Sequence, residues 1–162
     1  AESIEQAIPL ILDVIGCQFG VSRAYVFENS EDGCSCSNTF EWCNVGISSQ
    51  KEKLQNIAYA SLDNYMDNFD ENGVFFCQDI ENTPQSQRTL LRELGIYSLL
   101  QCAMCYDGLF AGFVGFDECT GHRLWTDEEI HALTLLSELF NIFLLKKREI
   151  KQAEEGFRQA QH

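Results

Sequence analysis

The feature that most constrains this chain is its C-terminal run, which contains neither glycine nor proline from Asp127 to Glu155. A helix from Asp127 to Ala160 would have about 34 residues and, at 1.5 Å each, a length of about 50 Å. A domain of 162 residues has a diameter of only about 30 to 35 Å. We therefore predict a helix whose last third projects beyond the domain, into solvent or into a partner.

The start of this helix is marked by Thr126-Asp127-Glu128-Glu129. The spacing fits a capping box, in which the Thr126 hydroxyl accepts from a first-turn N–H and Glu129 reaches back to the cap. The two acids between them favour the positive end of the helix dipole. The sequence thus predicts that the helix begins directly after Thr126.

Apolar residues along this helix recur in alternating steps of three and four, which is a heptad pattern with polar insertions. An apolar seam that extends past its own core is poorly stabilised alone. We therefore predict a dimeric connector to a further domain, and a frayed C-terminal tail is the alternative. The candidate dimer contacts are Leu133, Leu136, Phe140, Phe143, Ile150 and Phe157.

The composition predicts a packed domain, with 45% hydrophobic and 12% aromatic residues. The longest apolar stretches are shorter than the roughly 18 to 20 residues that span a bilayer. The first twenty residues carry acids in place of a cationic leader. A net charge of −14 repels nucleic acid and anionic lipid. We expect a cytoplasmic protein, with reduced cysteines, that neither binds nucleic acid nor inserts into a membrane.

The remaining elements predict an α/β (α+β) domain with a mainly antiparallel sheet. Asp107-Gly108 lies between two apolar runs, which is a strong hairpin signal. Both of these strands are apolar on both faces, so both faces of the sheet should be covered. We expect helices at residues 3–17, 48–69 and 84–94, and strands at 23–28, 39–43, 74–77, 97–106 and 109–117. In the first helix, Pro9 should be a kink or the start of a second segment. Thr83 and Gly95 are the expected N-cap and C-terminal stop of the third helix.

The order and spacing of five segments resemble a GAF domain, the small-molecule-sensing module of bacterial signalling proteins and of phosphodiesterases. The resemblance covers about residues 4–148. It divides the chain into a sensor domain, residues 1–148, and an extension of the signalling helix, residues 149–162. The segments are GVSRAYVFE, FEWCNVGISSQKEKLQNI, LLRELGIYSLLQCAM, DGLFAGFVGFDE and RLWTDEEIHALTLLSELF.

The resemblance implies a GAF/PAS-like central antiparallel sheet of about six strands. Terminal helices would cover one face and form a homodimer contact, and a ligand pocket would lie on the other face. The implied function is a regulatory module that couples pocket occupancy to a covalently linked output domain through a dimeric C-terminal helix. That output domain, such as a diguanylate cyclase or a histidine kinase, would lie outside this chain, so we expect no enzyme activity here.

The pocket residues can be proposed from the elements that the resemblance places around it. Arg88 and Arg92 lie one helical turn apart and could receive an anionic group, whereas a solvated helix face is the alternative. The candidate ligand-binding residues are Trp42, Phe76, Asp79, Ile80, Arg88, Arg92, Cys102 and Met104.

No known cofactor of the family has a signature here. Cys102 and Cys105 differ by an odd number on a predicted strand, so they face opposite sides and cannot share a zinc ion. A bilin would need a Cys-His pair and haem an inward histidine, and neither can be placed. The motif of cyclic-nucleotide binders is broken at Phe116-Asp117. The expected ligand is therefore an unidentified small molecule.

Two other interpretations stay open. The chain could be a structural dimerisation domain with a collapsed pocket. It could also be a cysteine-dependent methionine sulfoxide reductase, as some GAF relatives are, although no cysteine or serine lies in a nucleophile motif. Cys34 and Cys36 occupy a polar turn and are candidate oxidation-prone thiols. We predict no catalytic residue.

Overall fold

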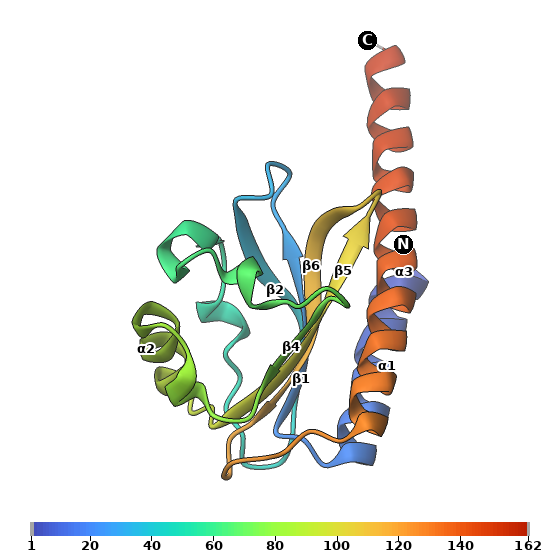
Figure 1. Cartoon of the computed structure of the whole chain (residues 1–162). Helices are drawn as coiled ribbons and strands as arrows, with labels where there is room; N and C mark the ends of the chain where they lie inside the picture. The colour runs from blue at the N-terminus through green and yellow to red at the C-terminus, as the bar shows by residue number, and fades with distance from the viewer. Residues whose placement is uncertain (1, 162) are drawn as a thin grey trace.

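The computed structural model describes residues 2–161, so the outer ends of the predicted segments 1–148 and 149–162 lie outside the described residues. The domain has three layers: two terminal helices, a sheet, and a layer of short helices and loops (Figure 1). The six strands run in the order β3-β2-β1-β6-β5-β4, and every neighbouring pair is antiparallel. This architecture confirms the predicted fold class.

The regular elements have the following bounds. The helices are α1 (Glu2–Phe19), α2 (Gln85–Glu93) and α3 (Asp127–Ala160). The strands are β1 (Arg23–Asn29), β2 (Ser35–Cys43), β3 (Ile57–Ala58), β4 (Val74–Cys77), β5 (Ser98–Tyr106) and β6 (Leu109–Glu118). Four 3₁₀ turns are η1 (Lys51–Lys53), η2 (Tyr59–Leu62), η3 (Tyr65–Asn68) and η4 (Ile80–Asn82).

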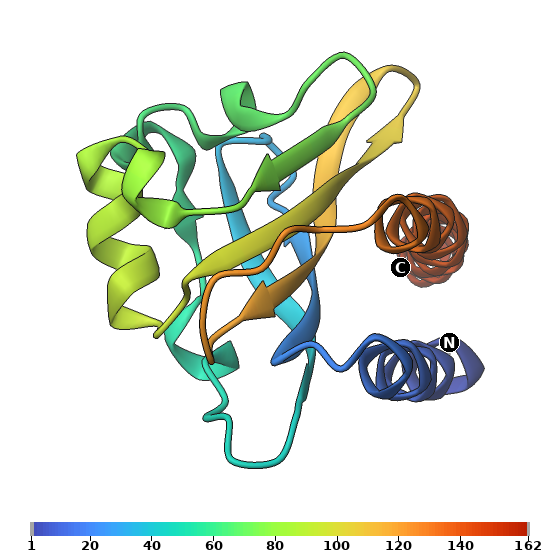
Figure 2. The same cartoon turned by 60° about the horizontal axis from the view of Figure 1, so that its bottom comes forward.

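The sheet separates two apolar cores. Along β1, Ala24 and Val26 belong to the core under the terminal helices, whereas Tyr25 and Phe27 belong to the core under α2 and the 3₁₀ turns. This alternation follows from the two-residue period of a strand. Figure 2 shows α1 and α3 side by side on one face of the sheet and α2 beyond the other. The prediction that both faces are covered is confirmed.

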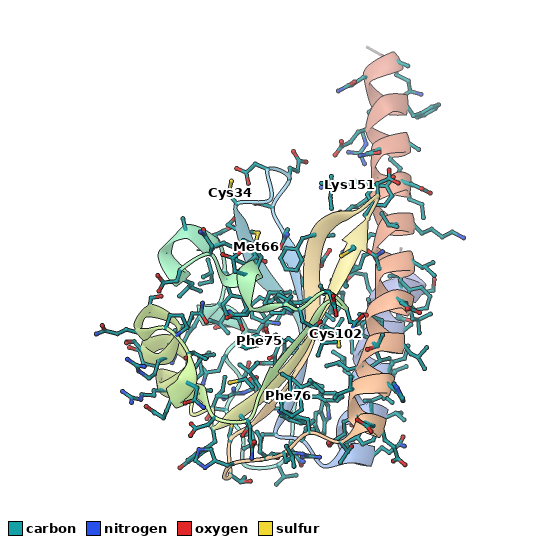
Figure 3. All side chains as sticks on the ribbon, in the orientation of Figure 1. Cys34, Met66, Phe75, Phe76, Cys102 and Lys151 are labelled. Carbon is teal, nitrogen blue, oxygen red and sulfur yellow. The ribbon has the colours of Figure 1, made fainter. Side chains whose placement is uncertain are left out.

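Helix α3 begins and ends where the sequence predicts. The Thr126 hydroxyl accepts from the Glu129 N–H at 3.2 Å, and the Thr126 N–H donates to Glu129 Oε1 at 2.8 Å. Leu144 is the last buried residue of the helix. Near the level of Lys151 the β5–β6 hairpin ends, and α3 continues past it (Figure 3). None of the described helices has the length and apolarity that crossing a membrane requires.

The predicted helix over 48–69 is wrong. This segment contains η1, β3, η2 and η3 in place of a single helix. Asn56, Asp63 and Asn64 all have positive φ, a conformation that interrupts a right-handed helix and that Asn and Asp tolerate well. The apolar spacing was informative about burial, because Leu54 and Tyr65 lie in the core above the sheet.

Two details at helix ends also differ from expectation. Thr83 does not cap α2: Pro84 occupies the cap position, and the Thr83 hydroxyl donates to the Ile80 carbonyl at 2.5 Å. Pro9 neither ends nor starts a helix, because α1 runs through it. Gly95 does follow the end of α2 with a φ of +78°, as its predicted role as the helix stop requires.

Candidate ligand-binding site

A cavity lies on the face of the sheet opposite α1 and α3. Its floor comes from β1, β2, β5 and β6, and its roof from α2 and the segment over residues 50–65. The cavity volume is about 60 Å³. The lining includes Arg23, Tyr25, Phe27, Cys36, Asn38, Glu41, Gln50, Leu54, Ile57, Tyr59, Leu62, Tyr65, Leu90, Leu91, Leu94, Ile96, Gln101, Phe113 and Asp117.

The floor depends on a glycine that allows an aromatic ring to lie across the sheet. Tyr25 and Gly115 are paired across β1 and β6. A Cβ atom at Gly115 would come within 2.6 Å of the Tyr25 ring. Beside this pair, Phe27 stacks on Phe113 with ring centroids 4.8 Å apart. The floor is therefore a packed aromatic surface.

A buried ion pair lies at one end of this floor. Arg23 Nη1 lies 2.9 Å from Asp117 Oδ2, and both side chains are at most 5% exposed. The Tyr25 hydroxyl donates to the other Asp117 oxygen at 2.7 Å. Burial raises the pKa of Asp117 to about 6, although Arg23 and the Tyr25 hydrogen bond oppose the shift. The carboxylate is thus held ionised at neutral pH by its two partners.

A second set of hydrogen bonds joins the floor to the roof. The Tyr65 hydroxyl, from η3, donates to Gln101 Oε1 at 2.7 Å. Gln101 Nε2 in turn donates to the Tyr25 hydroxyl at 2.9 Å. Burial raises the pKa of both Tyr25 and Tyr65 well above the ordinary value, so both phenols stay neutral.

Two acceptors lie at the β2 side of the cavity. The Glu41 carboxylate accepts from the Ser49 hydroxyl at 2.5 Å and from the Gln50 N–H at 2.9 Å. The side-chain oxygen of Gln50 is buried and has no hydrogen-bond partner. A buried acceptor without a donor is uncommon in proteins and indicates a position for a water molecule or a ligand.

Half of the predicted ligand-binding residues lie on the face of the sheet opposite this cavity. Cys102 and Met104 are buried in the core under the terminal helices, and Trp42 packs against it. Phe76 pairs with Leu100, whose side chain belongs to that same core, and is 43% exposed. On β5, Cys102 and Met104 thus face the side of the sheet opposite to Gln101, which lines the cavity. Figure 3 shows Cys102 on the side of α3. The apolar residues of β5 occur on both faces, so they do not indicate which face holds the pocket, whereas the polar Gln101 lies on the cavity face.

The predicted residues near α2 also lie away from the cavity. Asp79, Ile80 and Arg92 line a separate surface cleft together with His122. Arg92 forms an exposed ion pair with Glu81. Arg88 donates to the carbonyl oxygens of Glu81 and Thr83 at 3.4 and 3.0 Å. Neither arginine lines the cavity, so the proposed pair of anion-binding arginines is not formed there.

Sequence reasoning missed the polar residues of the floor. Arg23, Gln101 and Asp117 each interrupt an apolar strand. Such a residue in a strand covered on both faces has to be paired or hydrogen-bonded. That rule was the available signal for Arg23 and Asp117.

The residues predicted as a dimer seam divide into two groups. Leu133, Leu136 and Phe140 are buried in the domain's own core, and Phe143 packs against it. Ile150 is partly buried, and Phe157 is 65% exposed on the projecting part of α3. The surface that α1 and α3 leave open carries other apolar residues: Leu10, Val14, Leu135, Leu139 and Ile142, which are between 37% and 66% exposed.

The cysteines form no cluster. All eight are free, and residues 2–161 contain no group of three or more His, Cys, Asp or Glu side chains arranged to hold a metal ion. Cys102 is buried and Cys105 is exposed. Cys36 lines the cavity, and burial raises its pKa to about 11. Cys34 is exposed in the β1–β2 turn.

Comparisons with known proteins agree with this fold. The family model described as "GAF domain" matches residues 3–144. The methanogenesis regulatory histidine kinase FilI of Methanothrix harundinacea is 30% identical over 134 residues, which cover 80% of this chain but 15% of that protein. The chain therefore corresponds to a small part of FilI.

Solved structures share the fold at low identity. GAF3 of Slr1393 from Synechocystis, solved in its photoproduct state, has a TM-score of 0.75 at 17% identity, with 91% of this chain and 98% of that chain covered. The blue-light-absorbing form of the PixJ GAF domain from Thermosynechococcus elongatus has a TM-score of 0.74 at 13% identity, with 99% and 96% covered.

Proposed function

The chain belongs to the GAF domain family, and from this premise we propose that it is a ligand-sensing module that regulates an attached output domain. The relative FilI is a regulatory histidine kinase, which supports a histidine kinase as the output. We place the module in the cytoplasm, as a homodimer whose C-terminal helix carries the signal. The division into a sensor, 1–148, and a helix extension, 149–162, is part of this proposal.

The cavity carries the proposal. It is largely apolar and has a few convergent polar groups, which is the usual form of a small-molecule site. The buried pair of Arg23 and Asp117 supports a functional role. Burying two charges costs desolvation free energy, so such a pair is not explained by stability alone. The side-chain oxygen of Gln50 has no hydrogen-bond partner, so a bound ligand could donate a hydrogen bond to it.

A route from the cavity to α3 is built from polar contacts. Glu118, next to Asp117 on β6, accepts from Arg123 Nη1 at 2.9 Å. Arg123 also pairs with Glu129, the acidic residue of the capping box. We propose that a ligand which shifts β6 changes the position of the first turn of α3. Such coupling needs two alternative arrangements that the ligand binds with different affinity.

The open face of α1 and α3 is the surface that we propose for dimerisation. Its apolar side chains, Leu10, Val14, Leu135, Leu139 and Ile142, leave a patch that a second copy can cover. Leu135, Leu139 and Ile142 recur at steps of four and three, the spacing of a coiled-coil seam. This set replaces the predicted seam where Leu133, Leu136 and Phe140 are already buried.

A thermal-shift screen with a blocked cavity tests ligand sensing. Leu62 lines the cavity and is only partly buried, so Leu62→Trp should fill the space without disrupting the core. A ligand at about one hundred times its dissociation constant should stabilise the native protein by about 2.7 kcal/mol. We expect Leu62→Trp to abolish that gain and Leu124→Trp, at an exposed leucine, to preserve it.

The screen also distinguishes the alternatives. A structural dimerisation domain would give no compound whose effect depends on Leu62. A cysteine-dependent reductase would need a reactive thiolate, yet the cavity's Cys36 has a pKa raised by burial, which opposes thiolate formation. Turnover of methionine sulfoxide that Cys36→Ser abolishes would contradict the sensor proposal.

A further inference from the structure

Most side-chain donors of the cavity wall already have an acceptor within the protein. Each of the three side-chain nitrogens of Arg23 donates: to Asp117, to the Ser48 carbonyl and to the Leu94 carbonyl. The hydroxyls of Tyr25 and Tyr65 donate to Asp117 and Gln101. Arg23, the only cation of the lining, uses three of its five N–H groups in these bonds, and its charge is paired with that of Asp117.

The acceptors are in a different state. Glu41 accepts two hydrogen bonds, and a carboxylate has about four acceptor sites. Among the described residues, no lysine, arginine or histidine lies within ion-pair distance of Glu41. The Gln50 amide beside it has a buried, unpartnered oxygen. A side-chain amide can rotate by 180° and offer either its oxygen as an acceptor or its nitrogen as a donor. An ionised carboxylate can only accept hydrogen bonds. Glu41 thus sets the requirement for a donor.

The charge of the lining points the same way. Its charged residues are Arg23, Asp117 and Glu41. Arg23 and Asp117 form a direct ion pair and neutralise each other. The Glu41 carboxylate then gives the cavity lining a net charge of one negative unit. Aromatic rings from Tyr25, Phe27 and other floor residues surround the space, and aromatic faces also attract cations.

The size of the cavity limits the guest. A cavity of about 150 Å³ accommodates benzene, so the 60 Å³ here limits the guest to fewer non-hydrogen atoms than benzene has. The remaining lining is aliphatic, from Leu54, Leu91, Leu94 and Ile96. A fitting molecule has a short branched or compact apolar body and one polar end.

We infer that this cavity selects small primary amines in their protonated form, with Glu41 accepting from the ammonium group and Gln50 beside it, and that it rejects carboxylates of the same shape. This inference rests on the proposed ligand-sensing function and names the chemical class of its ligand.

Three matched probes test it: isobutylamine, isobutanol and isobutyrate, which share one branched carbon skeleton. Near neutral pH they are cationic, neutral and anionic. Each is titrated into the protein while methyl NMR signals are followed for Leu91 and Ile96, which line the cavity. Leu133, in the core on the other face of the sheet, is the internal reference.

We expect isobutylamine to bind about tenfold more tightly than isobutanol, because a charge-assisted hydrogen bond is about twice as strong as a neutral one. Isobutyrate should produce no saturable shift. Glu41→Gln keeps the side-chain shape and should reduce the preference for the amine over the alcohol to within about twofold. Glu52→Gln, an exposed acid in the neighbouring turn, should leave the preference unchanged.

The outcomes distinguish a cavity without amine selectivity from a protein without a ligand site. Isobutyrate binding as tightly as the amine, or an amine preference that survives Glu41→Gln, overturns the inference. Isobutanol binding with no gain for the amine overturns it too, while the cavity remains a ligand site. Absence of any saturable shift at Leu91 and Ile96 from all three probes overturns the inference and removes support from the proposed function.

Discussion

Asp117 and Glu118 are consecutive on β6, yet their carboxylates belong to two different sites. Asp117 pairs with Arg23 at the floor of the cavity. Glu118 pairs with Arg123, which also pairs with Glu129 in the first turn of α3. One strand end therefore carries a carboxylate of the candidate ligand site next to a carboxylate that holds the long helix.

Arg123 should be essential for the attachment of α3. Its guanidinium pairs with Glu118 and Glu129, whose side chains are 9% and 4% exposed. Arg123→Ala leaves both carboxylates buried without a cation, and we expect a loss of about 3 to 5 kcal/mol in the free energy of unfolding. Urea denaturation measures this loss.

Arg158→Ala is the matched control, because Arg158 forms only an exposed pair with Glu154. Its loss should be below about 0.5 kcal/mol. A similar small effect for Arg123→Ala would show that the pairs with Glu118 and Glu129 do not hold the helix.

Asp117 should make stability depend on pH in a defined direction. Its pKa rises from 3.8 to about 6 on folding, so between these values the native state holds a proton that the unfolded state has lost. Stability from this group is therefore greatest below about pH 4 and falls, by up to about 3 kcal/mol, as the pH rises to about 6.

The measurement is the difference in the free energy of unfolding between the wild type and Asp117→Asn. Contributions from other acids largely cancel in this difference. As the pH rises from about 4 to about 6, we expect the wild type to lose stability relative to Asp117→Asn, and the difference should change little at higher pH. A difference that is constant, or that moves in favour of the wild type, contradicts the raised pKa.

Gly115 should be required for the floor of the cavity. A methyl group there meets the Tyr25 ring at 2.6 Å, so Gly115→Ala must displace the ring or bend β6. We expect a destabilisation of about 1 to 3 kcal/mol, typical of overpacking, and loss of any ligand-induced thermal shift.

Gly121→Ala provides the comparison, because no atom lies within 4 Å of a Cβ at Gly121. It should change stability by less than about 0.5 kcal/mol and leave ligand binding intact. Equal effects of the two substitutions would mean that the contact with Tyr25 is unimportant.

The open face of the terminal helices should govern self-association. Leu139→Glu places a charge in the middle of the exposed seam while avoiding the domain's own core, since Leu139 is 37% exposed. We expect light scattering coupled to gel filtration to report a dimer for the wild type and a monomer for Leu139→Glu. Leu124→Glu, at an exposed leucine that precedes α3 and is not part of the seam, should remain dimeric. A dimeric Leu139→Glu protein would exclude this face.

Short sequence motifs correctly predicted the structural features that depend on a few neighbouring residues. Thr126 and Glu129 defined the start of α3, and Asp107-Gly108 defined the β5–β6 turn, where both residues have positive φ. The segment 48–69 failed because Asn56, Asp63 and Asn64 adopt left-handed φ in a context that spacing alone does not reveal. Helical spacing of apolar residues there reported burial and not conformation.

The site was harder to predict than the fold. Cys102 and Gln101 are neighbours on β5, and a shift of one residue decides which of them faces the cavity. The apolar residues of β5 contain no information on this choice, because both faces of the strand are buried. The polar Gln101 was the one signal for the cavity face. Arg23 and Asp117, which are 94 residues apart, meet only through the register of β1 and β6.

The unbroken course of α3 has a consequence for whatever sequence follows Ala160. A continuous helix transmits its rotational phase, so each residue inserted or removed beyond Leu144 turns the following segment by about 100° and moves it by about 1.5 Å. Lengthening by a heptad almost restores the original orientation. Tolerance to insertions in the projecting part should therefore be periodic, and the phase is set by the cap at Thr126.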